Sequence, residues 1–110
     1  MAEYFQCIPL TTFDTSTLTG SYQAINGTGF PDPVKMMKFY NGGTNGVTIS
    51  YDGVTDHDYF PAGSTFIIDL QANHDTQSYS GGGQKVGKIG QIIYATGTAG
   101  TGSFYISGYY

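Results

Sequence analysis

The stretch "NGGTNGVTISY", residues 41–51, decides the fold of this chain. Its first half contains Asn-Gly twice and is the strongest turn signal in the sequence. Asn-Gly pairs supply the positive φ values of hairpin turns. In its second half, apolar or aromatic side chains alternate with Thr and Ser. This alternation is typical of a half-buried β-strand, so we expect a hairpin turn that leads into a strand.

Similar patterns recur on both sides of this stretch. In "STFIIDLQ" (64–71) we expect Phe66, Ile68 and Leu70 to face the core and the residues between them to face outward. Further strand candidates are "GSYQAI" (20–25), "VKMMKFY" (34–40), "IGQIIYAT" (89–96) and "SFYISGYY" (103–110). The segments between them are rich in Gly, Asn and Pro, which favour turns.

Composition supports the same fold class. The 110 residues include 17 Gly and 10 Tyr, only 11% are charged, and none is Arg. Helices draw on Ala, Leu, Glu, Lys and Arg, whereas Thr, Tyr, Phe and Ile favour strands. We therefore predict an all-β protein, an antiparallel, jelly-roll-like β-sandwich of seven or eight short strands. Residues 1–17 are expected to form an N-terminal arm or edge strand, and residues 18–110 a single sandwich domain.

Charge and hydropathy each argue against one class of partner. Eight acidic residues against four Lys give a net charge of −4, and no cluster of basic residues is present to neutralise phosphates. No apolar run approaches the ~20 residues that a membrane-spanning helix needs. We therefore expect neither nucleic-acid nor membrane binding. Cys7, the single cysteine, allows no internal disulfide and is expected to be a small apolar residue of an early strand.

The segment "YDGVTDHDYF" (51–60) raises the question of a metal site. Asp52, Asp56 and Asp58 could supply three oxygen ligands to calcium, but their spacing fits no known calcium-loop signature. A zinc site would need partners for His57, and the other histidine, His74, lies in a different turn. The preferred interpretation is a structural hairpin loop in which Asp56 and Asp58 cap backbone N–H groups. The three aspartates remain the calcium candidate, and a catalytic metal is the remaining alternative.

Catalytic motifs are missing from the sequence. There is no G-x-S-x-G elbow, and "GGGQKVGK" lacks the spacing of a phosphate-binding loop. We therefore predict no catalytic residues, no cofactor and no enzymatic activity.

Aromatic residues are abundant for one small core. Tyr is enriched in interfaces because it offers a large contact area at low entropy cost, although β propensity alone also enriches it. We expect part of this surplus to contact other copies of the chain or a larger partner. The interface candidates are Tyr4, Phe5, Tyr59, Phe60, Tyr105, Tyr109 and Tyr110.

The order of these motifs resembles a known group of proteins. "VKMMKFYNGGTNGVTISYDGVTDHDYFPAGSTFIIDLQANHD", followed by "KIGQIIYATGTAGTGSFYISGYY", resembles small structural proteins of tailed-bacteriophage particles. The resemblance covers about residues 18–110 and consists of strands and turns, so no functional residue is transferred from it. "NHDTQSYSGGGQKV" is more polar than that pattern, and the segment before residue 18 matches nothing in it.

The resemblance implies a virion component without enzymatic activity, made in the cytoplasm of a bacterial host. Its implied partners are other copies of itself and virion proteins such as the major capsid protein or the connector. A capsid decoration or cement protein is the first expectation. The alternatives are a neck or tail connector, a fibre-associated protein, and a module that binds a carbohydrate or a receptor.

Overall fold

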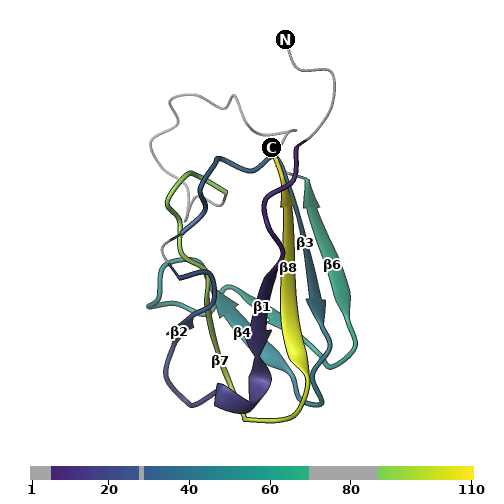
Figure 1. Ribbon diagram of the computed structural model, residues 1–110. Helices are drawn as coiled ribbons and strands as arrows, with labels where there is room; N and C mark the ends of the chain where they lie inside the picture. Colours follow the sequence, from purple (N-terminus) through teal and green to yellow (C-terminus); the bar gives the residue numbers. More distant parts are fainter. Residues whose placement is uncertain (1–5, 28, 70–86) are drawn as a thin grey trace.

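The computed structural model describes residues 6–27, 29–69 and 87–110, and it contains two antiparallel four-stranded sheets packed face to face (Figure 1). In these residues the one helical segment is the 3₁₀ turn η1 (Thr15–Thr17). The predicted all-β class and the β-sandwich are therefore confirmed.

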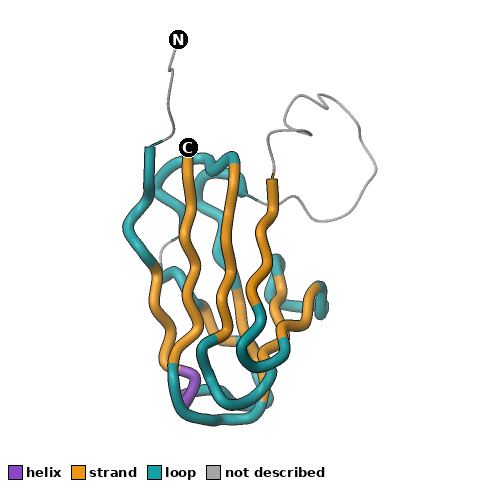
Figure 2. Tube along the Cα trace, turned by 90° about the vertical axis from the view of Figure 1, so that its right-hand side faces the viewer, coloured by secondary structure: helices purple, strands orange, loops and turns teal. Residues whose placement is uncertain are grey.

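Each sheet combines strands that are distant in the sequence. Sheet A contains, in spatial order, β1 (Thr11–Asp14), β8 (Ser103–Tyr109), β3 (Met36–Asn41) and β6 (Thr65–Asp69). Sheet B contains, in spatial order, β2 (Gln23–Ala24), β7 (Tyr94–Gly97), β4 (Val47–Ser50) and β5 (Asp58–Phe60). Figure 2 looks onto sheet A, with the strand that ends at the C-terminus beside β1 and with β6 at the opposite edge.

The connections explain this order. β4 and β5 are consecutive strands that pair within one sheet, whereas every other pair of consecutive described strands lies in different sheets. The pairs β1·β8, β2·β7, β3·β6 and β4·β5 are all formed. The chain therefore pairs like one long hairpin, with β4 and β5 at its tip, that has been wound into two sheets.

This connectivity corrects the prediction for residues 41–46. The chain leaves sheet A at Asn41 and enters sheet B at Val47, so the segment is a corner between sheets rather than a hairpin. None of its glycines has a positive φ. They are required for close approach instead: a Cβ on Gly42 would lie 2.9 Å from the carbonyl oxygen of Ser103.

Asn41 holds this corner together. Its side chain is fully buried, and its Nδ2 donates to the carbonyl oxygens of Phe60 (2.8 Å) and Asn45 (3.0 Å). Its Oδ1 accepts the N–H of Gly43 (2.9 Å). A buried amide is tolerated only when it is hydrogen-bonded, and here one residue of sheet A is tied to the end of β5 in sheet B.

An aromatic cluster fills the core between the sheets. Phe39 and Phe104 come from sheet A and Phe60 from sheet B, and their ring centroids lie 5.4–6.0 Å apart. Phe39 and Phe60 meet edge to face, an arrangement that the ring quadrupoles favour. Aliphatic side chains from both sheets surround the cluster, among them Met37, Val47, Ile49, Ala95 and Ile106.

The strand predicted for residues 89–96 is shorter than expected, since β7 begins only at Tyr94. Polar side chains bond the segment before it. Upstream of it, Gln91 is buried, with Oε1 accepting the N–H of Gly87 (2.6 Å) and Nε2 donating to the carbonyl of Tyr51 (3.2 Å). The side-chain amide of Asn26 donates to the carbonyl of Gln91 and accepts the N–H of Ile93. In a longer β2–β7 ladder, main-chain groups would make these bonds.

The alternation predicted for β6 is confirmed by its register. Phe66 lies opposite Phe39 and Ile68 opposite Met37, so both face the inner side of sheet A. Phe66 nevertheless keeps 46% of its surface exposed, because β6 is an edge strand and no strand covers its open side in the described structure. The expectation for Leu70 lies outside the described residues.

Candidate functional site

The aspartate-rich segment forms the loop of the β4–β5 hairpin. Asp52 Oδ1 accepts the backbone N–H groups of Val54 (2.8 Å) and Thr55 (2.9 Å) and the hydroxyl of Ser50 (2.9 Å). The Ser50 Oγ in turn accepts the N–H of Gly53 (2.9 Å). These bonds, first those from Thr55 and Val54, lower the pKa of Asp52 to about 2.

The other two aspartates serve a different purpose from the predicted one. Asp58 Oδ2 accepts the hydroxyl of Tyr51 (2.6 Å), and Asp56 accepts the hydroxyl of Tyr22. Asp52 therefore caps the backbone of the loop, while Asp56 and Asp58 each bind a phenol. Sequence patterns did not reveal this division, because Tyr22 lies 34 residues before Asp56.

Both phenols are held in their protonated form by these contacts. The hydrogen bond to Asp56 raises the pKa of Tyr22 to about 12. Burial, and then the hydrogen bond to Asp58, raise the pKa of Tyr51 well above its usual range. The ring of His57 packs against that of Tyr51 in a tilted arrangement, with centroids 5.4 Å and planes 34° apart, and its Nδ1 accepts the N–H of Tyr51 (3.0 Å).

The calcium candidate receives no support from this geometry. Across residues 6–27, 29–69 and 87–110, no three His, Cys, Asp or Glu side chains come together as a metal site. Asp52, Asp56 and Asp58 are each engaged with a different protein donor. The arrangement stiffens a hairpin loop. His74, the other histidine considered for a zinc site, lies outside the described residues.

The outer face of sheet A carries a second group of side chains, which we call the tyrosine face. The register places Tyr40 beside Tyr105, and Lys38 beside Ile67, on the side away from sheet B. The rings of Tyr40 and Tyr105 stack with centroids 6.0 Å apart and planes 16° apart. Tyr40 is 40% exposed and Ile67 56%. This face therefore presents a rigid aromatic pair beside an exposed aliphatic side chain.

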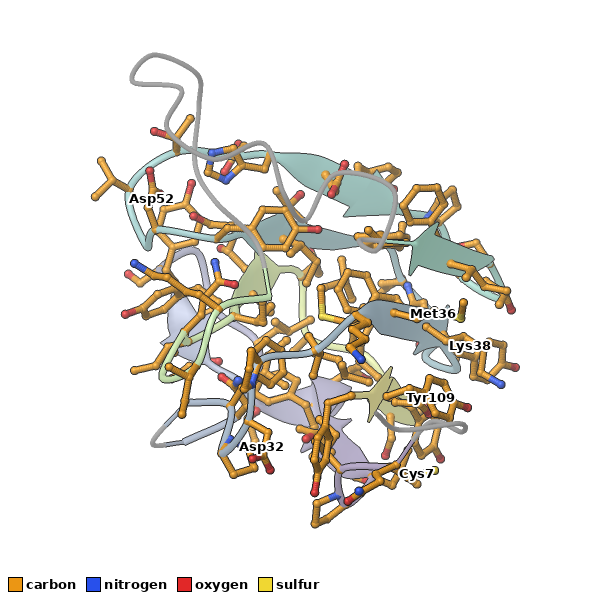
Figure 3. The ribbon with its side chains drawn as sticks, turned by 90° about the horizontal axis from the view of Figure 1, so that it is seen from above. Cys7, Asp32, Met36, Lys38, Asp52 and Tyr109 are labelled. Atoms are coloured by element: carbon orange, nitrogen blue, oxygen red, sulfur yellow. The ribbon has the colours of Figure 1, made fainter. Side chains whose placement is uncertain are left out.

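The same face continues toward the end of the sheet where β8 ends. Met36 pairs with Tyr109, and Cys7 forms an isolated bridge to Tyr109. Figure 3 shows Met36, Lys38, Tyr109 and Cys7 along one side of the molecule and Asp52 on the opposite side. Cys7 is exposed and lies in an isolated bridge before β1, so the expectation of a small apolar residue within an early strand is corrected.

The structure separates the predicted interface residues. Tyr105 and Tyr109 lie half-buried on the tyrosine face, and Tyr110 is half-buried after the end of β8. Tyr59 lies on sheet B and is 63% exposed. Phe60, by contrast, is 5% exposed and belongs to the core, so it presents almost no surface to a partner. Tyr4 and Phe5 lie outside the described residues.

Several exposed apolar residues were missed by the sequence reasoning. Tyr40, Phe66 and Ile67 are the clearest examples, because they gather on or beside one edge of sheet A. The signal was present in "TFII", which carries apolar residues on both faces of one strand. Such a strand is either covered on both sides or exposes one of them.

No helix in the described residues is long and apolar enough to cross a membrane. Comparison of the chain with protein-family models, with curated proteins and with solved structures found no match.

Proposed function

We propose that this chain is a non-enzymatic structural protein of a tailed-bacteriophage particle, and that it decorates or cements the capsid. The observation that carries the proposal is the tyrosine face, in which the Tyr40–Tyr105 stack lies beside the exposed Ile67. Interface centres are enriched in Tyr and depleted in charge, and the part of this face formed by Tyr40, Tyr105, Ser107 and Ile67 contains one charged residue, Lys38.

The topology supports the same proposal. We infer that the domain is a jelly roll, since β1·β8, β2·β7, β3·β6 and β4·β5 pair within two four-stranded sheets. Viral capsid proteins use this architecture, as do lectins and cupins, so fold alone does not select among them. The resemblance of residues 18–110 to small phage proteins favours the virion.

A structural role also agrees with the chemistry of the polar groups. The hydrogen bonds of Asp52, Asp56 and Asp58 satisfy the hairpin and two phenols. His57 uses Nδ1 for a backbone N–H, so this nitrogen is not available as a general base. In the proposal the chain acts without a cofactor, and its partners are copies of itself and the major capsid protein or connector.

Immunogold electron microscopy of a lysate from the source, with an antibody against the recombinant chain, tests the proposal. Label distributed over particle heads is the expected result. Label confined to the vertex or tail would replace the cement role with that of a connector or fibre-associated protein. Unlabelled particles would refute the virion role.

A carbohydrate-binding module is the second candidate, and Tyr59 is the observation that favours it. This ring is the most exposed tyrosine among the described residues, and a sugar ring can stack on such a surface. Thr48 lies beside it on the outer face of sheet B and offers a hydroxyl. Saturable binding on a glycan array, abolished in Tyr59→Ala but retained in Tyr40→Ala, would establish this function. A blank array would exclude it for the glycans tested.

A further inference from the structure

We propose that two copies of this chain pair through β6, antiparallel and about a two-fold axis at Ile67, so that the two A sheets join into one continuous sheet. This inference deepens the self-association in the proposed function and names the element responsible. It does not require the partner copies to lie on a virion.

Among the described residues, the backbone of β6 has a partner strand on one side only. Asn41 N–H donates to the carbonyl of Ser64 (2.9 Å), which fixes the hydrogen-bonded positions of the β3·β6 ladder. Gly42 N–H donates to Ser103 in β8, as expected for the neighbouring position. Bonding alternates along an antiparallel ladder, so Phe66 and Ile68 bond to β3. The N–H and C=O groups of Thr65 and Ile67 therefore point away from the sheet.

β6 also lacks the features that protect the other edges of the described sheets. β2 has two residues, and β5 has three and is followed by Pro61. β1 has four residues, with Pro9 shortly before it. β6 has five residues, without Pro or Lys, and exposes Phe66 on one face and Ile67 on the other. Long apolar edges of this kind are sites where another strand adds.

The sequence of β6 is complementary to itself in one register. A two-fold axis at Ile67 places it opposite its own copy and brings the outward backbone groups of Thr65 and Asp69 together across the axis. Phe66 then lies opposite Ile68 of the second copy, where cross-strand apolar pairs are favourable. The two Asp69 residues fall at opposite ends, so like charges do not face each other. The strand is therefore complementary to itself in this register, which is why we infer that the occupant is a second copy. The pairing covers part of Phe66 on one face and of Ile67 on the other.

Site-directed cross-linking tests the register. The native cysteine is removed by Cys7→Ser, and Ile67→Cys is then oxidised with a mild oxidant under native conditions. Hydrogen-bonded antiparallel partners have Cα atoms about 5.5 Å apart, within disulfide range. The matched control is Lys38→Cys, on the same face but one strand inward. Its two copies would be separated by three strand spacings, about 14 Å, beyond disulfide reach.

The expected result is a disulfide-linked dimer for Ile67→Cys and none for Lys38→Cys. Failure of Ile67→Cys to cross-link, or equal cross-linking of both variants, would overturn the proposed pairing.

Sedimentation analysis tests the backbone contribution. The unmodified chain is expected at twice the 11.8 kDa of one copy at high micromolar concentration. Ile67→Pro removes an N–H that bonds no described residue of the same copy, so it should leave the circular dichroism spectrum unchanged and abolish the dimer. A monomeric wild-type chain, or a folded Ile67→Pro dimer, would contradict the inference. Particle labelling together with a monomeric chain would reject β6 pairing while leaving the virion role intact.

Discussion

At the scale of single residues, buried and half-buried side-chain amides connect segments that the backbone ladders do not reach. Asn41 ties the corner after β3 to β5, Asn26 bonds the segment before β7, and Gln91 reaches Gly87 and Tyr51. Each is stabilising only while its partners are present, because an unsatisfied buried polar group loses its hydration without compensation.

Asn41→Ala is expected to be strongly destabilising. It leaves the carbonyls of Phe60 and Asn45 and the N–H of Gly43 without their partner, and each such loss costs about 1–3 kcal/mol when the group stays buried. We expect the free energy of unfolding in urea to fall by about 3 kcal/mol in total. Asn45→Ala is the control, since its exposed side chain makes one bond, to Ala99, and its loss should cost about 1 kcal/mol or less. Equal losses in both variants would contradict the role of Asn41.

The lowered pKa of Asp52 predicts that the stability of the fold decreases at acidic pH. The pKa of Asp52 in the folded chain is about 2, below the 3.8 of an unperturbed aspartate. The folded state therefore prefers the ionised form, and this stabilisation is complete above pH 3.8 and is lost as the pH falls toward 2. Thermal unfolding measured between pH 5 and pH 2 should show a steeper loss of stability in wild type than in Asp52→Asn. Parallel curves would show that the carboxylate does not contribute.

At the scale of elements, the corners between the sheets depend on glycine. Gly102, in the connection from β7 to β8, has a φ of 95°, and a Cβ there would lie 2.4 Å from the carbonyl oxygen of Gly42. The corner at residues 41–46 and the connection from β7 to β8 therefore lie against each other at one end of the sandwich. Thr15 Oγ1 donates to the Gly102 carbonyl at the same place (2.9 Å).

Gly102→Ala is expected to destabilise the fold by at least about 2 kcal/mol, because a left-handed φ and a backbone clash act together. Gly20→Ala is the matched control, since no atom lies within 4 Å of its Cβ position and its φ is not positive. Chemical denaturation of both variants measures the difference. A Gly102→Ala protein as stable as Gly20→Ala would contradict the close approach of the two corners.

Element patterns also show what the sequence can predict. Alternation identified β4, β6 and β8 because their inner residues are apolar and their neighbours mostly polar. It could not show that residues 41–46 turn between sheets, since Asn-Gly favours a turn without specifying which strands it joins. Tyr59 and Phe60 could not both be exposed, because adjacent strand residues face opposite sides. The phenol partners of Asp56 and Asp58 follow from tertiary packing, to which local spacing gives no access.

At the scale of the whole molecule, the two sheets divide into inner and outer strands. β8 and β3 in sheet A and β7 and β4 in sheet B each have a neighbour on both sides. Their hydrogen bonds should open only with global unfolding, whereas those of the two-residue β2 should open locally.

Native-state hydrogen exchange measures this division. We expect the slowest amide exchange in β3 and β8 and fast exchange in β2, because β2 has few bonds to break. The amide of Ile67 gives an independent signature: it should exchange quickly at low protein concentration, where the chain is monomeric, and slowly when copies pair. Uniform protection of all strands would contradict the division into inner and outer strands.

The winding that pairs β1 with β8 has a consequence for the route by which the chain folds. Its contacts join residues far apart in sequence, such as Thr15 and Gly102, which are 87 residues apart. Chains with such high contact order commonly fold in about a millisecond to a second, because loop closure precedes most of the stabilising contacts. Among the described strand pairs only the β4–β5 hairpin is local, so we expect it to form early and the β1·β8 pair to close late. Until then the apolar β6 edge is available to any neighbouring chain, and refolding yield should therefore fall as the protein concentration rises.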